Sequence, residues 1–346
     1  MTKPLHSGEE QPWIFAGHSD FVAGLAGYDM KAPLTGAPAG AVPGASLAAE
    51  SGLVGGLFEV LVPPITRLQV TKTAEGMEIE YPPRLDRPYA LDQNLAGIDA
   101  LLRLRRESKG VRLVRSVPEI LQAKDEDAFA AVLHLADADA IDTDLGALYV
   151  LHEAGLRSLA ITWSRQNAFG YGVPFRSPGT PDIGPGLTEA GVRLVQACNE
   201  LGVLVDLAHL NAAGFWDVAA RSQAPLVVTH GAAHTLSPTT RALTDDQITA
   251  IADSGGVIGV SLEGVAPSPA GIVSDMVDQI RYLVERAGPQ SVALGSDLYR
   301  CPDAAHPAGT VLLPELLTAL REAGYDRATI TAIAHANWLR VLRATW

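Results

Sequence analysis

Two short apolar stretches, each ending in a histidine, decide the fold of this chain. Residues 204–209 read Leu-Val-Asp-Leu-Ala-His, and residues 226–230 read Leu-Val-Val-Thr-His. An amphipathic segment at residues 211–222 lies between them, so the pattern predicts a strand, a helix and a second strand. Parallel strands that are buried on both faces have continuous apolar sequences of this kind. Each predicted strand therefore delivers an imidazole, His209 or His230, at its carboxyl end.

The same alternation of apolar strand and amphipathic helix runs through the whole chain. It predicts a mostly parallel sheet. Eight such units, with no G-x-G-x-x-G sequence after the first strand, favour a closed barrel over a doubly wound sheet. The predicted fold class is therefore α/β, a (β/α)8 barrel of the TIM type with insertions. The eight strands are predicted at residues 13–16, 111–116, 130–136, 158–163, 204–209, 226–230, 256–262 and 291–297.

The length of 346 residues fits one barrel domain over residues 1–346. About 250 residues suffice for such a barrel, so the excess indicates insertions. The segment 21–90 is too long for a connecting loop in a compact domain. We expect it to be an insertion after the first strand, and it could act as a lid. It includes an apolar run at 54–62 and two short strand-like stretches near 70 and 79.

The composition excludes several classes of protein. A hydrophobic fraction of 47% and a charged fraction of 19% are typical of a globular protein with a large core. The net charge of −13 argues against nucleic acid and anionic membrane surfaces as partners. Residues 1–13 have no apolar core like that of a signal peptide, and the sequence has no long uncharged apolar run. We therefore expect a cytoplasmic enzyme that acts on a small-molecule substrate.

Metal-ligating side chains fall at the ends of several predicted strands. The first strand leads to His18 and Asp20, the fifth to His209, the sixth to His230 and the eighth to Asp297. The carboxyl ends of all strands meet at one mouth of a barrel, so these side chains are expected to converge. Imidazole nitrogen and carboxylate oxygen suit zinc and similar metals. A bound metal would lower the pKa of a water molecule to about 7.

Each histidine also has an ordinary structural interpretation. A single histidine at a strand end is more often a hydrogen-bonded structural residue than a ligand. The convergence of four candidates, His18, Asp20, His209 and His230, favours the metal site. His134 and His234 are poorer candidates, since the first lies deeper in its strand and the second in a loop, and we expect structural roles for both.

At these residues the sequence resembles the membrane dipeptidase (renal dipeptidase) family of zinc peptidases, in its bacterial branch. The resemblance extends over nearly the whole chain. Its motifs are Gly-His-Ser-Asp at 17–20, Asp-Leu-Ala-His at 206–209, Thr-His at 229–230, Gly-Ser-Asp at 295–297 and Asn-Trp-Leu-Arg-Val at 337–341.

The resemblance implies a metallo-dependent hydrolase built on a (β/α)8 barrel with zinc as its cofactor, as one or two ions. Members of the family cleave dipeptides, including dipeptides with a D-residue at the carboxyl side. By resemblance, His18 and Asp20 would hold one metal, and His209 and His230 the other. The family also uses a glutamate at the end of the third strand as a bridge between the metals. A homodimer is possible, because members are often dimers.

The resemblance assigns three further residues. Arg241 follows His230 by eleven residues, as in the family, and would bind the carboxylate of the substrate; a guanidinium is suited to that task. Asp297 would accept a proton from water or bind the amino group of the substrate. Trp163 stands where other members have a histidine that steadies the tetrahedral intermediate, and the bacterial branch often has tryptophan there.

One departure from the family pattern bears directly on the metal site. The position of the bridging glutamate reads Ala136, and a methyl group cannot bind a metal. Asp137 and Asp139 follow it, but Asp137 should face the other way and Asp139 lies beyond the strand. Glu263, at the end of the seventh strand, could supply a carboxylate instead. The sequence leaves these alternatives open.

Three functions are therefore compatible with the sequence. The first is a metal-dependent hydrolase that cleaves dipeptides or similar small amides by attack of metal-bound hydroxide. The second is a diverged one-metal enzyme that acts on another C–N bond or catalyses another reaction, which Ala136 favours. The third is a non-catalytic descendant that binds small ligands. Metal content separates them, because they predict about two, about one and no zinc ions per chain.

Overall fold

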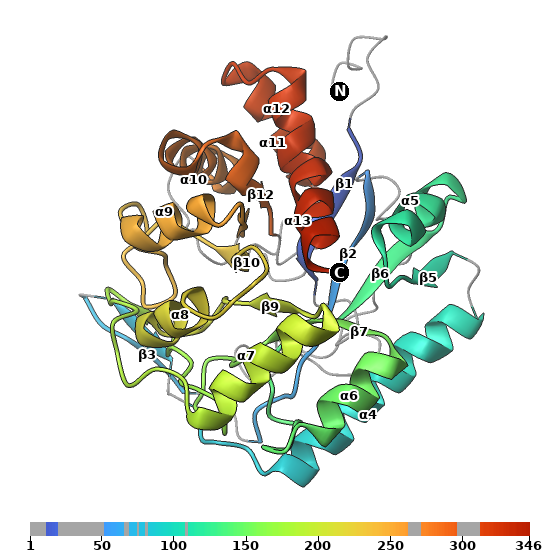
Figure 1. Cartoon of the computed structure of the whole chain (residues 1–346). Helices are drawn as coiled ribbons and strands as arrows, with labels where there is room; N and C mark the ends of the chain where they lie inside the picture. Colours follow the sequence, from blue (N-terminus) through green and yellow to red (C-terminus); the bar gives the residue numbers. More distant parts are fainter. Residues whose placement is uncertain are drawn as a thin grey trace.

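Eight parallel strands form one nearly closed barrel in the part of the chain that the structure describes (Figure 1). The structure is a computed structural model, and the residues it describes are 12–19, 52–65, 69–74, 76–79, 82–107, 110–261, 271–295 and 312–346. The strands follow one another in the order β1, β2, β6, β7, β9, β10, β11 and β12, and β12 contacts β1. The predicted (β/α)8 barrel is confirmed. The strand bounds are β1 Ile14–Ser19, β2 Leu53–Val60, β6 Phe129–Leu135, β7 Leu156–Ala160, β9 Leu204–Asp206, β10 Val227–Gly231, β11 Val257–Val260 and β12 Val292–Leu294.

Helices surround the strands, as Figure 1 shows. Five of the described helices begin at a side chain that accepts a hydrogen bond from the first turn: Ser116 before α5, Thr188 before α7, Asn211 before α8, Thr244 before α9 and Asp326 before α12. None of the helices among the described residues combines the length and the hydrophobicity needed to cross a lipid bilayer. The helix bounds are α4 Arg87–Glu107, α5 Val117–Asp125, α6 Gly146–Ala154, α7 Glu189–Leu201, α8 Ala212–Ala219, α9 Asp245–Asp253, α10 Ile272–Ala287, η1 Pro289–Ser291, α11 Leu312–Glu322, α12 Arg327–Thr331, η3 Ala332–Ala336 and α13 Asn337–Thr345.

The second barrel strand is β2, which differs from the sequence-based assignment. β2 lies between β1 and β6 and pairs with both in parallel. It falls inside the segment 21–90 that we expected to be an insertion, so that boundary is wrong for residues 53–60. The stretch at 111–116 is predicted to be the second barrel strand, but it contains only the short strand β5 (Val111–Leu113). β5 pairs with β6 and is not one of the eight barrel strands. The error arose because β2 is separated from α4 by about 26 residues rather than by a short loop.

A small antiparallel sheet stands beside the barrel. The strand-like stretches near 70 and 79 form β3 (Val70–Lys72) and β4 (Met77–Ile79), which pair with each other in antiparallel. The two-residue strand β8 (Arg176–Ser177) adds to β4 from the loop after β7. This sheet therefore ties the segment after β2 to the loop after β7.

The closing helix α13 packs against the amino-terminal ends of the barrel strands. Trp338 is fully buried there, with Phe15, Leu204 and Val257 in the same apolar cluster. Its indole N–H donates to the carbonyl of Leu294 at 3.0 Å. A methyl group at Gly17 would overlap the Trp338 ring, so glycine is required next to His18. The end of the barrel opposite the histidines is thus filled by side chains.

Candidate metal centre

Three of the predicted metal ligands lie together at the carboxyl ends of their strands. His18 is in β1, His230 is in β10, and His209 follows β9. The ring centroids of His18 and His230 are 4.0 Å apart, and those of His209 and His230 are 5.0 Å apart. All three residues are at most 6% exposed. Asp20, the fourth predicted ligand, lies outside the described residues, as do the predicted catalytic Asp297 and Glu263.

The neighbours of His230 fix its tautomer. The hydroxyl of Thr229 donates to Oδ2 of Asp206 at 2.6 Å and lies 2.8 Å from Nδ1 of His230. A hydroxyl has one hydrogen, so Thr229 can only accept from His230. The hydrogen of His230 is therefore on Nδ1, and Nε2 keeps its lone pair. Burial, followed by the nearby His18 and Arg241, holds the pKa of His230 well below its usual value, which favours the neutral imidazole that a metal needs.

His209 stands on a strained backbone directly opposite His230. Its φ of 64° is in the left-handed region, which a non-glycine residue rarely occupies away from turns and functional sites. The hydroxyl of Ser164 lies 2.8 Å from its Nδ1. Its Nε2 lies 3.0 Å from Nε2 of His230 and 3.0 Å from Nη2 of Arg241. One ring nitrogen thus faces a second imidazole and a guanidinium at hydrogen-bond distance.

The two contacts of Nε2 of His209 compete for a single lone pair. Arginine only donates, so its contact requires a lone pair on Nε2 of His209. His230 also presents a lone pair, and two lone pairs would then face each other. If His209 instead donates to His230, the guanidinium of Arg241 meets an N–H group. Two Nε2 atoms whose lone pairs face one another are a donor set that fits zinc, which would then take the lone pair of His209 in place of the N–H group of Arg241.

Glu59, at the end of β2, is the functional candidate that the sequence analysis missed. Its side chain is 2% exposed, and Oε2 lies 2.7 Å from Nε2 of His18. The only signal in the sequence is one charged residue inside the apolar run 54–62. That signal was lost because the run was assigned to an insertion rather than to the barrel.

The donors touch in pairs rather than as a finished coordination group. Within the residues that the structure describes, no three His, Cys, Asp or Glu side chains are arranged to hold a metal ion. Close polar contacts join His18 to Glu59 and His209 to His230. Their roles as metal ligands therefore stay predictions.

A polar layer below the histidines supports them. Nδ1 of His134 lies 2.8 Å from the hydroxyl of Ser158, and its Nε2 lies 3.8 Å from Oδ2 of Asp206. Burial, and then the charge of His18, lowers the pKa of His134 to about 3, so it stays neutral. Asp206 also accepts hydrogen bonds from the backbone N–H groups of Ala208 and Thr229. His134 therefore has the structural role that its depth in the strand predicts.

Ala136, directly after β6, has no carboxylate to offer, and its two acidic successors are engaged elsewhere. The guanidinium of Arg165 is fully buried and contacts Oδ2 of Asp137 at 2.5 Å and Oδ2 of Asp139 at 2.7 Å. It also donates to the carbonyl of Val62 at 3.1 Å. Burial, and then the neighbouring Asp139, raises the pKa of Asp137 to about 7 against the opposing effect of Arg165. Both aspartates are therefore turned towards Arg165 rather than towards the histidines.

Two aromatic side chains, Trp163 and Phe175, lie beside His209 and Arg241. The Trp163 ring centroid lies 5.9 Å from that of His209, and Phe175 lies 5.7 Å from His209. The guanidinium of Arg241 lies over the Phe175 ring at 5.0 Å. The structure therefore brings both predicted substrate-binding residues, Arg241 and Trp163, next to His209.

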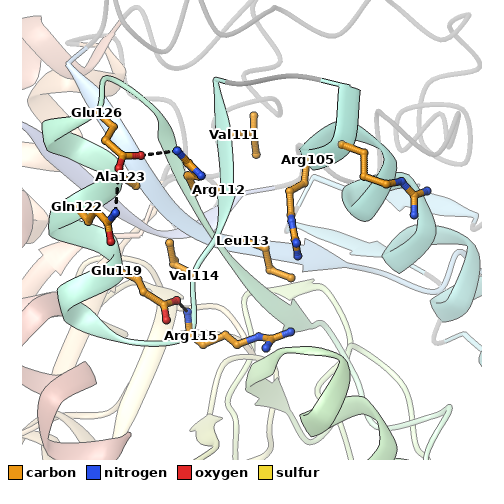
Figure 2. A pocket seen from close by; sticks show the side chains of 11 residues that line it. Arg105, Val111, Arg112, Leu113, Val114, Arg115, Glu119, Gln122, Ala123 and Glu126 are labelled. Carbon is orange, nitrogen blue, oxygen red and sulfur yellow. Dashed lines mark hydrogen bonds and ion pairs between the residues drawn. The ribbon is translucent and has the colours of Figure 1, made fainter.

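A pocket of about 720 Å³ lies elsewhere, between α4, β5 and α5 (Figure 2). Four arginines line it, and one of them, Arg112, pairs with Glu126 at 2.5 Å. The backbone N–H of Arg115 donates to Glu119 at 2.7 Å, as Figure 2 shows. This pocket contains none of the histidines and is not the predicted site.

Comparisons with known proteins confirm the family resemblance. Residues 47–345 match the family model described as "Membrane dipeptidase (Peptidase family M19)". An uncharacterized protein in the pqqA 5′ region of Klebsiella pneumoniae is 39% identical over 246 residues, which are 68% of this chain and 89% of that protein. A metallo peptidase from Rhodobacter sphaeroides, liganded with a phosphinate mimic of the dipeptide L-Ala-D-Ala, is 34% identical with a TM-score of 0.85, covering 97% of this chain and 100% of that one. The metallo peptidase described as dipeptidase AC is 34% identical with a TM-score of 0.87, covering 97% and 99%.

Proposed function

This chain belongs to the membrane dipeptidase family, and on that premise we propose that it is a zinc-dependent hydrolase that cleaves dipeptides or similar small amides. The observation that carries the proposal is the convergence of His18, His209 and His230, beside Arg241, at one end of the barrel. The dipeptide mimic in the similar Rhodobacter sphaeroides structure supports a substrate of this size.

The donors divide by position. His18 and Asp20 come from the first strand and its end, and His209 and His230 from the fifth and sixth barrel strands. In this proposal they hold one or two zinc ions. Bound zinc would supply Lewis-acid activation of water and of the scissile carbonyl at neutral pH. Thr229 and Ser164 orient two of the imidazoles through their Nδ1 atoms.

Arg241 orients the substrate. A guanidinium binds a carboxylate through two parallel hydrogen bonds, and the carboxyl end of a dipeptide offers one. Trp163 and Phe175 border the same space and would contact an apolar side chain of the substrate. Asp297 is proposed to accept a proton during cleavage. A cytoplasmic location and a homodimer stay predictions.

A panel of substrates tests the proposal. The zinc-loaded chain should hydrolyse L-Ala-L-Ala and L-Ala-D-Ala. Arg241→Met should lower kcat/KM for these dipeptides by roughly 100-fold or more, because the bidentate contact to the carboxylate is lost. The same variant should change hydrolysis of the matching dipeptide amides much less, because they have no carboxylate. Absence of hydrolysis across the panel by the zinc-loaded wild type would contradict the proposal.

Ala136 supports a second candidate, a one-metal enzyme with another small C–N bond substrate. With a methyl group at that position, a second metal would lack the bridge that the family uses. About one zinc per chain, with hydrolysis of other small amides but not of dipeptides, is the result that would favour it.

A further inference from the structure

We propose that Glu59 is the carboxylate of the metal site in this chain, supplied by β2 in place of the residue that Ala136 lacks on β6. The inference rests on the proposed metal site, and it concerns a residue for which neither the sequence motifs nor the comparisons provide a role. In this chain the ligand carboxylate would then come from β2, whereas the family pattern places it after the neighbouring strand β6.

The first reason is the direction in which Glu59 points. Its side chain is almost fully buried, and Oε2 lies 2.7 Å from Nε2 of His18. Nε2 is the nitrogen that His209 and His230 also turn towards their shared centre. A carboxylate oxygen and an imidazole nitrogen in direct contact are two donors aimed at one point. Both kinds of atom are ligands that zinc binds.

The second reason is the register of the sheet. Glu59 is the direct partner of His134 across the β2–β6 pair, so both side chains are on the same face of the sheet. The backbone N–H of Ala136 donates to the carbonyl of Val60 at 3.1 Å. Residues 59 and 136 are therefore on adjoining strands at the same mouth, with Glu59 one layer deeper. A side chain that extends from this layer can approach the same rim.

The third reason is the environment of Ala136 itself. Its methyl group belongs to an apolar cluster with Leu61, Ile79 and Trp163. The carboxylates that follow it, Asp137 and Asp139, both bind Arg165. The two acidic side chains that follow Ala136 are thus directed at Arg165, whereas Glu59 of β2 is directed at His18.

The test compares zinc binding in Glu59→Gln with the wild type. Glutamine keeps the shape and removes the charge, so we expect the variant to lose about one zinc per chain after dialysis, measured by plasma mass spectrometry. Its zinc affinity in a competitive chelator titration should fall by more than the roughly 10- to 100-fold loss that follows when a residue hydrogen-bonded to a ligand is removed. Glu126→Gln is the matched control, because Glu126 also forms a short ion pair but lies in the pocket of Figure 2. It should bind zinc like the wild type.

Two further variants separate ligand loss from misfolding. The double variant Glu59→Gln/Ala136→Glu returns a carboxylate to β6 and should recover much of the lost zinc. If Glu59→Gln fails to fold, Glu59→Asp decides, because it keeps the charge but withdraws the oxygens by one methylene. It should bind zinc roughly 10-fold more weakly or worse. Wild-type zinc content and affinity in a folded Glu59→Gln, or in Glu59→Asp, would overturn the inference.

The outcome is distinguishable from failure of the proposed function. If the wild type binds zinc, Glu59→Gln loses it and no dipeptide is cleaved, the role of Glu59 stands and the dipeptidase proposal fails. If the wild type cleaves dipeptides and Glu59→Gln keeps its zinc, the dipeptidase proposal stands and the role of Glu59 fails.

Discussion

At the scale of single residues, His230 shows how a hydrogen-bond chain prepares a ligand. The Thr229 hydroxyl donates a hydrogen bond to Asp206, and the same hydroxyl accepts a hydrogen bond from Nδ1 of His230. The chain leaves the lone pair of Nε2 directed at the other imidazoles. Sequence reasoning identified His230 by its place at the end of an apolar run. It could not identify the role of Thr229, because threonine is common in strands for reasons of packing alone.

Removal of that hydroxyl should weaken zinc binding. In Thr229→Val the tautomer of His230 is no longer fixed, and Asp206 loses a donor. We expect zinc affinity to fall by roughly 10- to 100-fold, measured by chelator competition. Thr229→Ser keeps the hydroxyl and is the matched control. Equal affinities in the valine and serine variants would show that the hydroxyl does not prepare the ligand.

The buried Asp137 should make the stability of the fold depend on pH. Burial and Asp139 raise its pKa from 3.8 to about 7 in the folded chain. The folded state therefore binds this proton more tightly than the unfolded state. Protonation of Asp137 therefore adds to the free energy of unfolding below about pH 4, and this contribution is lost as the pH rises to about 7.

Asp137→Asn removes this titration. The difference in free energy of unfolding, wild type minus variant, should therefore fall between about pH 4 and pH 7 and level off above it. Urea denaturation of both proteins across this range measures the difference. A difference that is constant with pH would contradict the raised pKa.

At the scale of elements, the loops at the barrel mouth are joined by Arg165. Its guanidinium, from the loop after β7, reaches Asp137 and Asp139 after β6 and the carbonyl of Val62 after β2. The three loops that border Glu59 and Ala136 are therefore linked through one buried cation. From the sequence, Asp137 and Asp139 remained open as metal ligands. No pattern in the chain shows that a distant arginine binds both of them.

Loss of this cation should destabilise the fold strongly. Arg165→Met leaves two buried carboxylates without their partner, and breaking a buried ion pair in this way costs about 3–5 kcal/mol. Arg103→Met, which removes an exposed pair with Asp99, is the control and should cost no more than about 1 kcal/mol. Urea denaturation compares the two. Similar losses would mean that Arg165 does not join the loops.

β2 marks the limit of element prediction from this sequence. Most helices and seven of the eight barrel strands could be placed from apolar periodicity and caps. β2 could not, because its run of apolar residues follows a long glycine- and proline-rich segment and precedes another irregular stretch. The short strand β5 is also apolar, so the sequence predicts β5 rather than β2 as the second strand of the barrel. Only pairing in space, Gly55 with Ala130 through Val60 with Leu135, separates the two.

At the scale of the whole molecule, the barrel explains why residues more than 200 positions apart, such as His18 and His230, meet. Parallel strands place every carboxyl end at one mouth, so His18, His209 and His230 could be expected together from sequence order alone. The contact of Glu59 with His18 could not, since it depends on which strand neighbours β1. The opposite end is filled by α13 and Trp338.

The most direct measurement of the central claim is the zinc content of the purified chain, compared with that of His209→Ala/His230→Ala. The account predicts one to two zinc ions per wild-type chain and fewer in the double variant, with far-UV circular dichroism unchanged. A wild-type chain that binds no zinc when the metal is supplied, or a double variant that binds as much as the wild type, would contradict it.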